Sequence, residues 1–440
     1  MKVFNSLTGK KENLDSFEKG KISIYVCGMT VYDDCHIGHA RTFLSFDMIV
    51  RYLRSRNIEV KYIRNITDVD DKILQRAKEK NQEPSVLTDR YIERMTSDFN
   101  ALGMISPDKE PRATENIQII LDLISRLIEG GYAYYKGGDV YFSVESFPEY
   151  GKLSNQKMDE ILSGARIEID EEKRNPADFV LWKKGDENLV WDSPWGKGRP
   201  GWHLECSVMS KKFLGDKFDI HGGGMDLIFP HHENEIAQSR CANENETFAN
   251  YWVHNGFITI ASEKMSKSQG NILKIGDFKN KVSGQVLRLA LISAHYKQPL
   301  DWNDKLLSEC EKTINKWYES YTDIKKQVLI PEDYLSPLYD DLNTPGYIAN
   351  LHKLFDKSQK GSIKDKEIFV SACNFIGLLN ENKNSWDKYK QSKSMISEEE
   401  IKQKITERNN ARKNKDYKAA DKIRDELLDK GVLIEDKDDK

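Results

Sequence analysis

Strand and helix signals alternate at the start of the chain in an order that restricts its fold more than any other feature. A β-branched run at residues 22–26 is followed by a glycine-containing turn, and apolar residues then recur at helical spacing from about His39 to Arg56. A second strand signal, at residues 59–63, follows directly. Strand, helix and strand in this order form a β-α-β unit, so we predict an α/β fold built on a parallel sheet.

The 440 residues exceed what one hydrophobic core normally holds, which predicts several domains. Residues 108–200 break the alternation with a helix signal, short strand signals and a loop-rich stretch. We interpret them as an insertion between two halves of the sheet, because strand and helix signals resume after residue 201. From about Asp304 onward, patterns rich in Lys, Glu and Leu predict helices alone.

Composition restricts the class of protein. No apolar run approaches the roughly 20 residues that a membrane span needs, and the start of the chain has no signal-peptide pattern. Six cysteines lie far apart in the sequence, which suits a reducing compartment better than a disulfide scaffold. We therefore expect a cytoplasmic protein without membrane association. Because the net charge is −4, any nucleic-acid surface must be a local patch.

Two short motifs indicate a nucleotide site. Residues 36–39 (HIGH) stand where a strand leads into a helix, the position at which α/β sheets bind phosphates, and Gly38 lets the backbone approach them. Far downstream, residues 264–268 (KMSKS) supply two lysines and two hydroxyls. Each motif alone is also typical of an ordinary helix cap or a solvated turn. Their occurrence together, each after a strand signal, favours ATP binding.

The two motifs resemble the signatures of class I aminoacyl-tRNA synthetases, which carry them on a Rossmann fold. The resemblance implies that His36 and His39 stabilise the phosphates of ATP, and that Lys264 and Lys267 stabilise the leaving pyrophosphate. Fixed cations and hydrogen-bond donors aimed at that developing charge lower the barrier to attack by a carboxylate. Magnesium is expected to accompany ATP.

Four dispersed residues form a candidate metal site. His231 and Glu235 are four residues apart in a helix predicted to begin at Pro230, so their side chains share one face. With Cys27 and Cys206 they provide two thiolates, an imidazole and a carboxylate, a reasonable set for zinc. Other interpretations stay open, because isolated cysteines are often core residues and charged helix starts are often capped surfaces. The same helix offers two alternative ligands, His232 and Glu233.

Three stretches, at residues 25–41, 198–207 and 218–237, resemble cysteinyl-tRNA synthetases specifically. The resemblance implies that zinc binds the thiol of the substrate cysteine and is held by Cys27, Cys206, His231 and Glu235. A borderline-soft metal prefers sulfur to oxygen, whereas a pocket separates cysteine from serine by size only about 10- to 200-fold. The resemblance also places Thr30, Thr67, Trp202 and His221 around the cysteine, and Gly28 and Asp226 near the adenylate.

A basic stretch near the C-terminus is the candidate nucleic-acid surface. Residues 402–424 contain nine Lys or Arg and three acidic residues. Helical spacing would align several of these cations for phosphate contacts, although a charged run is also typical of a solvated helix face. Residues 411–436 resemble the anticodon-binding region of bacterial cysteinyl-tRNA synthetases. The family's usual Gly/Thr segment and Trp-Arg end do not follow, so the residues that read the anticodon stay unassigned.

The resemblance implies ATP-dependent ligation of L-cysteine to tRNA(Cys) through a cysteinyl-adenylate, by a monomer with one zinc ion per chain. The predicted domains are the first half of the Rossmann catalytic domain (1–107), a connective insertion (108–200), the second Rossmann half (201–258), the lysine motif with a tRNA stem-contact segment (259–305), a helical bundle (306–392) and a small anticodon-binding region (393–440).

Two alternatives stay open. A related ligase could pass the activated cysteine to an amino sugar, although the long helical C-terminal half favours tRNA. A catalytically idle relative that binds tRNA or stores zinc is disfavoured by the intact motif residues His36, His39, Lys264 and Lys267.

Overall fold

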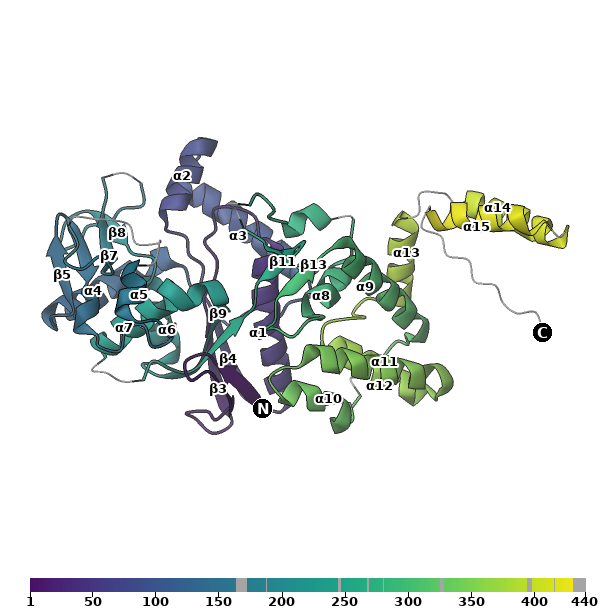
Figure 1. Ribbon diagram of the computed structural model, residues 1–440, viewed down its shortest axis with the longest axis horizontal. Helices are drawn as coiled ribbons and strands as arrows, with labels where there is room; N and C mark the ends of the chain where they lie inside the picture. The colour runs from purple at the N-terminus through teal and green to yellow at the C-terminus, as the bar shows by residue number, and fades with distance from the viewer. Residues whose placement is uncertain are drawn as a thin grey trace.

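The computed structural model describes residues 1–163, 172–186, 188–243, 247–266, 269–279, 281–324, 328–393, 398–414 and 416–429. Its centre is a four-stranded parallel sheet in the order β10-β9-β3-β4 (Figure 1). The predicted α/β class is therefore confirmed. The strands are β3 (Lys21–Val26), β4 (Glu59–Arg64), β9 (Phe218–Gly224) and β10 (Ala249–Asn255).

The helix α1 (Ile37–Ser55) connects β3 to β4 and completes the predicted β-α-β unit. It ends before Asn57, whose left-handed φ of 58° cannot continue a helix. The buried face of α1 packs tightly on β9: an added Cβ on Gly222 of β9 would lie 2.1 Å from the ring of Phe46 of α1. The apolar residues at helical spacing are all buried, as expected: Phe43, Phe46, Ile49, Val50 and Leu53.

The insertion forms a second sheet, which is antiparallel and has the order β5-β6-β7-β8. It lies between β4 and β9 in the chain and beside the central sheet, at the left of Figure 1. The boundaries assigned to this domain from the sequence stay predictions. Its elements are α4 (Ile117–Glu129), β5 (Ala133–Lys136), β6 (Asp139–Phe142), α5 (Met158–Ser163), β7 (Phe179–Lys184) and β8 (Gly198–Pro200), with short 3-10 turns at Ala113–Asn116 and Val144–Ser146.

The helix predicted to begin at Pro230 begins at Glu233 instead. It follows a wide helical turn at Ile228–His232, in which Phe229 has extended backbone angles. A proline disfavours helical angles in the residue before it, which explains the interruption. The remaining elements of this half of the molecule are β1 (Lys2–Asn5), β2 (Lys10–Asn13), α2 (Asp71–Lys80), α3 (Pro84–Ala101), α6 (Leu204–Leu214), a 3-10 turn at Met225–Leu227 and α7 (Glu233–Ala242).

A small sheet with the order β12-β11-β13 links the parallel sheet to the C-terminal half. In the described part of that half, helices are the only regular elements after Asp304, as predicted. The last two, α14 and α15, lie at the end of the molecule far from the central sheet (Figure 1). The elements are β11 (Ile258–Ile260), β12 (Glu263–Lys264), a 3-10 turn at Ile275–Phe278, α8 (Gly284–Ile292), β13 (Leu300–Trp302), α9 (Asp304–Trp317), a 3-10 turn at Tyr318–Ser320, α10 (Glu332–Tyr339), α11 (Thr344–Lys360), α12 (Ile363–Phe375), α13 (Lys383–Lys393), α14 (Glu398–Lys413) and α15 (Tyr417–Asp429).

None of the helices in the described ranges combines the length and the apolar character that crossing a membrane requires.

Candidate active site

A cavity of about 460 Å³ opens beyond the carboxyl ends of β3 and β9. The chain leaves β3 toward β4 on one side and returns to β9 on the other, so this is the switch point at which α/β sheets bind ligands. Cys27, directly after β3, belongs to the cavity lining. Six residues that the sequence predicts to bind substrates also line it: Gly28, Thr30, His36, His39, Trp202 and Asp226.

All four predicted metal ligands meet beside this cavity and are buried. The Sγ atoms of Cys27 and Cys206 lie 3.5 Å apart, and Cys27 Sγ lies 3.3 Å from Glu235 Oε1. His231 Nε2 lies 3.6 Å from Cys206 Sγ and 3.0 Å from Glu235 Oε1. Bonds of about 2.0–2.3 Å to a tetrahedral ion would hold its ligand atoms about 3.2–3.8 Å apart. Three of these four distances lie in that range and the 3.0 Å from His231 to Glu235 is shorter, so the set can hold zinc after a small adjustment.

A second group of potential ligands overlaps the first, because Cys27 and Glu235 also lie close to His221 and His232. His221 Nε2 lies 3.5 Å from Cys27 Sγ and 3.2 Å from Glu235 Oε2. His232 Nε2 lies 3.3 Å from Cys27 Sγ. Glu235 therefore takes part in both groups, through Oε1 in the first and Oε2 in the second. The first group contains two thiols and the second only one, so a thiophilic ion favours the first.

The electrostatics of the cluster favour the anionic forms of Glu235 and Cys206 but not of Cys27. Burial opposes the charge of Glu235, but His221 and His231 outweigh burial and lower the pKa of this carboxyl to about 2. Burial also opposes ionisation of Cys206, yet a hydrogen bond from Cys27 and the nearby His231 lower the pKa of its thiol. The pKa of Cys27 is raised by burial and by its neighbours. Cys206 is therefore the thiol that ionises first.

Polar side chains behind the cluster hold it in place. Reasoning from sequence missed Asn65 and Glu205, whereas Thr67 was predicted to lie around the substrate cysteine. Asn65 Oδ1 accepts a hydrogen bond from Gly28 N at 2.7 Å and lies 3.7 Å from Cys206 Sγ. Asn65 Nδ2 donates to Thr67 Oγ1 at 3.2 Å, and Thr67 Oγ1 donates to Glu205 Oε1 at 2.8 Å. Asn65 directly follows β4, and a polar residue at the carboxyl end of a parallel strand is the signal that could have identified it.

Aromatic rings extend the cluster in two directions. On the inner side, His232 Nδ1 lies 2.7 Å from His254 Nε2, and His254 Nδ1 lies 2.8 Å from Ser6 Oγ. On the cavity side, the indole of Trp202 stacks on His231 with ring centroids 4.3 Å apart. These contacts lead from the cluster through His254 to Ser6, and no short motif in the sequence marks His254.

The two histidines of the HIGH motif form the start of α1. His36 Nδ1 accepts from His39 N at 3.3 Å, and His39 Nδ1 accepts from His36 N at 3.4 Å, so each ring caps the other's backbone. The rings stack with centroids 3.6 Å apart and line the cavity. The positive dipole end of α1 lies at the same place, which suits phosphate groups.

The KMSKS motif begins beside the HIGH motif. Met265 packs against Gly38 so closely that an added Cβ on this glycine would lie 3.2 Å from Met265 Cε. Lys264 does not line the cavity, because its Nζ lies 3.5 Å from the ring centroid of Phe257. Lys267 lies outside the described residues. The contacts of both lysines with ATP therefore stay predictions.

A second connection between the two motifs was not predicted from sequence. Lys274, shortly after the KMSKS motif, forms an ion pair with Asp33 at 2.7 Å, just before the HIGH motif. Next to it, Ile37 N donates to Leu273 O at 3.0 Å. Lys274 and Asp33 both line the cavity. The segments that precede the first motif and follow the second are thus held side by side.

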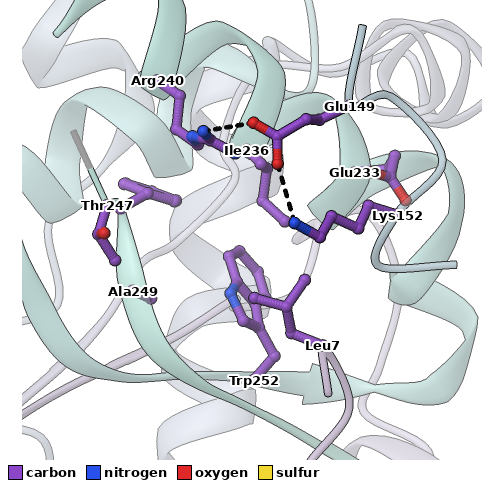
Figure 2. Close-up of a pocket in the computed structure, with 10 residues that line it drawn as sticks. Leu7, Glu149, Lys152, Glu233, Ile236, Arg240, Thr247, Ala249 and Trp252 are labelled. Atoms are coloured by element: carbon purple, nitrogen blue, oxygen red, sulfur yellow. Dashed lines mark hydrogen bonds and ion pairs between the residues drawn. The ribbon is translucent and has the colours of Figure 1, made fainter. Parts of the chain in front are cut away.

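The opposite side of α7 faces a smaller cavity of about 260 Å³ (Figure 2). Glu233 points to that side, where its Oε2 accepts from Ser154 N and Ser154 Oγ, both at 2.9 Å. This alternative ligand is therefore turned away from the metal cluster, whereas His232 lies within it. Trp252 separates the two sides, because it lines the smaller cavity while its ring centroid lies 4.5 Å from that of His221.

The basic stretch at residues 402–424 spans α14 and α15, which pack against each other. Lys404 forms an ion pair with Glu426 at 2.7 Å across the two helices. Lys415 lies outside the described residues. Six cations of the stretch are exposed: Lys402, Arg412, Lys413, Lys418, Lys422 and Arg424.

Known proteins resemble this chain over nearly its whole length. Residues 13–312 match the family described as tRNA synthetases class I (C) catalytic domain, and residues 399–440 match the cysteinyl-tRNA ligase anticodon binding domain. The chain is 58% identical over 439 residues to a cysteine–tRNA ligase of Pelagibacter ubique, which covers 99% of this chain and 97% of the relative. A cysteine–tRNA ligase of Marinobacter nauticus is 46% identical over 453 residues, covering 99% and 97%.

A solved structure resembles the fold at much lower identity. Mycobacterium tuberculosis methionyl-tRNA synthetase in complex with methionyl-adenylate aligns with a TM-score of 0.58 at 15% identity. The alignment covers 81% of this chain and 89% of that one.

Proposed function

Because the chain belongs to the cysteinyl-tRNA synthetase family, a family of ligases, we propose that it activates L-cysteine as cysteinyl-adenylate and then transfers the cysteinyl group to tRNA(Cys). One observation carries the proposal. Two thiols, an imidazole and a carboxylate gather at a cavity whose lining also includes the stacked His36 and His39. This supports a single substrate site in which one group would select the thiol and the start of α1 would bind phosphates.

Zinc is the metal that this donor set fits, and its proposed ligands are Cys27, Cys206, His231 and Glu235. When bound, zinc would supply a borderline-soft Lewis acid that prefers sulfur to oxygen and favours the ionised thiol. Cysteine and serine differ by one atom, and a pocket alone separates such pairs weakly. Asn65 would support the set by holding Gly28 and the region of Cys206 in place.

The other pocket residues divide into two groups. Thr30 and Trp202 line the cavity and are proposed to contact the substrate cysteine directly. Thr67 and His221 are fully buried behind the lining and would act by fixing their neighbours. Gly28 lines the cavity and is proposed to contact the adenylate. Its lack of a side chain lets the backbone of Asn65 pack against it, since an added Cβ would lie 1.7 Å from Asn65 O. Asp226, at the cavity edge, is proposed to bind the adenylate as well.

In the first step, the cysteine carboxylate attacks the α-phosphate of ATP. A new O–P bond forms, the bond to the bridging oxygen breaks, and pyrophosphate leaves. We assign His36 and His39 to the phosphates, because both line the cavity at the positive dipole end of α1, where they could stabilise developing negative charge. Lys264 and Lys267 are assigned to the pyrophosphate, which requires Lys264 to leave the ring of Phe257 when ATP binds. Magnesium would enter with ATP.

In the second step, a ribose hydroxyl of the terminal tRNA adenosine attacks the adenylate carbonyl and AMP leaves. Binding and orientation would supply most of the rate in both steps. We favour tRNA over an amino-sugar acceptor because residues 399–440 match an anticodon-binding family. The exposed cations of α14 and α15 suit contacts with phosphates. We also expect the enzyme to act as a monomer in the cytoplasm.

The direct test is cysteine-dependent exchange of labelled pyrophosphate into ATP, measured beside serine. Exchange with cysteine and not with serine is expected, and absence of exchange with cysteine would refute the activation step. Labelled cysteine offered with tRNA(Cys) or with amino sugars then identifies the acceptor, and transfer to amino sugars alone would refute the assignment of tRNA.

A further inference from the structure

The helix α1 carries a buried cation that the proposed chemistry does not yet use. Arg41 is 1% exposed and forms no ion pair with an acidic side chain in the described ranges. Burial lowers its pKa to about 10. A buried charge without an anionic partner costs free energy, so its hydrogen bonds must compensate. All of them go to backbone carbonyls, namely Gly256 O at 3.3 Å, Phe257 O at 2.6 Å, His295 O at 3.2 Å and Gln298 O.

These carbonyls lie in the two links that lead into the small sheet β12-β11-β13. Gly256 and Phe257 join β10 to β11, and residues 295–298 lie between α8 and β13. The two links touch each other, because a Cβ added to Gly256 would lie 2.6 Å from Lys297 O. Arg41 therefore binds both links where they cross, at a point where a side chain larger than glycine does not fit.

The small sheet carries the start of the KMSKS motif. Its strand β12 pairs with β11 and ends at Lys264. Lys264 Nζ lies over the ring of Phe257, the same residue whose carbonyl accepts the 2.6 Å hydrogen bond from Arg41. Arg41 itself lies in the first turns of the helix that His36 caps. A single guanidinium thus connects the helix of one nucleotide motif to the base of the other.

We propose that Arg41 is a positioning residue that sets the KMSKS motif relative to the HIGH motif for attack on ATP. The inference rests on the proposed function and deepens it, since it names the group that aligns the two motifs. Arg41 touches neither substrate. A shift of about 1 Å between groups that must act together can lower a rate about 100-fold, so loss of this alignment should appear in the rate of the ATP step.

A second buried arginine provides a matched control. Arg288 is 0% exposed and also binds carbonyls, those of Leu102 and Gly103 at 3.1 and 3.0 Å, together with Ile376 O. Unlike Arg41, it forms an ion pair with an acidic side chain, that of Asp47. Its contacts join α1 to the ends of α3 and α12, away from the KMSKS motif. A role confined to stability would make the two arginines behave alike.

The experiment compares Arg41→Lys and Arg288→Lys in cysteine-dependent pyrophosphate exchange, with ATP and cysteine varied separately. We expect Arg41→Lys to lower kcat about 10- to 100-fold, while the KM for cysteine and the zinc content stay as in the wild type. Arg288→Lys should lower the unfolding temperature but change kcat less than about threefold. Wild-type kcat in Arg41→Lys, or equal losses of kcat in both variants, would overturn the proposal.

A second variant, Arg41→Gln, removes the buried charge and keeps one amide donor. It leaves several buried carbonyls without a partner, so we expect a lower unfolding temperature, and kcat is measured well below that temperature on protein whose circular dichroism matches the wild type. It should still lose kcat, because one amide cannot bind both links. Full activity in folded Arg41→Gln would overturn the proposal. Pyrophosphate exchange by the wild type tests the proposed function, which fails if the wild type shows no exchange. If the wild type is active and both Arg41 variants match it, only the positioning role of Arg41 is removed.

Discussion

The thiol end and the nucleotide end of the active-site cavity are built in opposite ways. The thiol end consists of Cys27, Cys206, His231 and Glu235, which are at most 3% exposed and are supported by further buried polar groups. The nucleotide end consists of the HIGH and KMSKS motifs, and there Lys264 sits exposed on a two-residue strand. The difference indicates that amino-acid selection uses groups fixed in advance, whereas ATP chemistry uses a segment that must change position.

The largest expected effect breaks the thiol end alone. Cys206→Ser replaces the thiol that ionises first by a hydroxyl, which is a poor zinc ligand. We expect loss of bound zinc and a fall in cysteine-dependent exchange on the order of 10³-fold. Metal analysis and exchange measure both. Cys241→Ser is the matched control, because Cys241, on α7, is buried like Cys206 but lies outside the cluster. Full zinc in Cys206→Ser would contradict the ligand assignment.

A smaller effect should separate the two ends. In His36→Asn the new side chain can still cap α1, so the fold should persist while the imidazole at the phosphates is lost. We expect kcat for exchange to fall about 10²- to 10³-fold with unchanged zinc content and an unchanged KM for cysteine. His352→Asn, a change at an exposed residue of α11 far from the site in sequence, is the control. If His36→Asn also loses zinc, the two ends are not independent.

The supporting groups of the thiol end offer a test of intermediate size. Asn65→Ala removes the hydrogen bonds to Gly28 and Thr67. We expect zinc to bind about 10- to 100-fold more weakly, with exchange restored by excess zinc. Competition with a chelator measures the affinity. Asn116→Ala is the control, because Asn116 is equally buried but bonds to groups outside the site. Equal zinc affinities in the two variants would remove Asn65 from the support.

The smallest expected effect concerns Asp98, whose neighbour Asp34 lines the active-site cavity. Burial and Asp34 raise the pKa of Asp98 to about 6, above its value of about 3.9 in an unfolded chain. The folded protein therefore binds this proton more tightly, and the stability that protonation contributes is present below about pH 4 and lost as the pH rises through 6. Asp98→Asn should flatten the fall in unfolding free energy between pH 4 and 6, measured by urea titration. Glu93→Gln, a change at an exposed residue of the same helix, should leave the fall as in the wild type. Identical stability profiles of the two variants would contradict the raised pKa of Asp98.

Sequence patterns predict a helix or strand well when its position is determined by its own residues. The helical spacing of Phe43, Phe46 and Ile49 was sufficient to place α1, and the β-branched run before it was sufficient to place β3. The predicted start of α7 was three residues too early. Proline disfavours helical backbone angles in the residue before it, and Phe229, which precedes Pro230, has extended angles.

The site was only partly predictable, because its contacts join elements far apart in the chain. The spacing of His231 and Glu235 indicated a shared face, but nothing local placed His221 and His232 against Cys27. The hydrogen bonds of Arg41 to four carbonyls likewise depend on how two distant links cross. Such contacts leave no periodicity in the sequence.

The most direct test of the account is X-ray absorption at the zinc edge, with and without substrate. The cluster offers two sulfur ligands, those of Cys27 and Cys206. The account predicts that L-cysteine raises the sulfur coordination of the bound zinc from two to three and that L-serine leaves it at two. Sulfur coordination that stays the same in the presence of saturating L-cysteine would contradict the claim that the metal selects the substrate thiol.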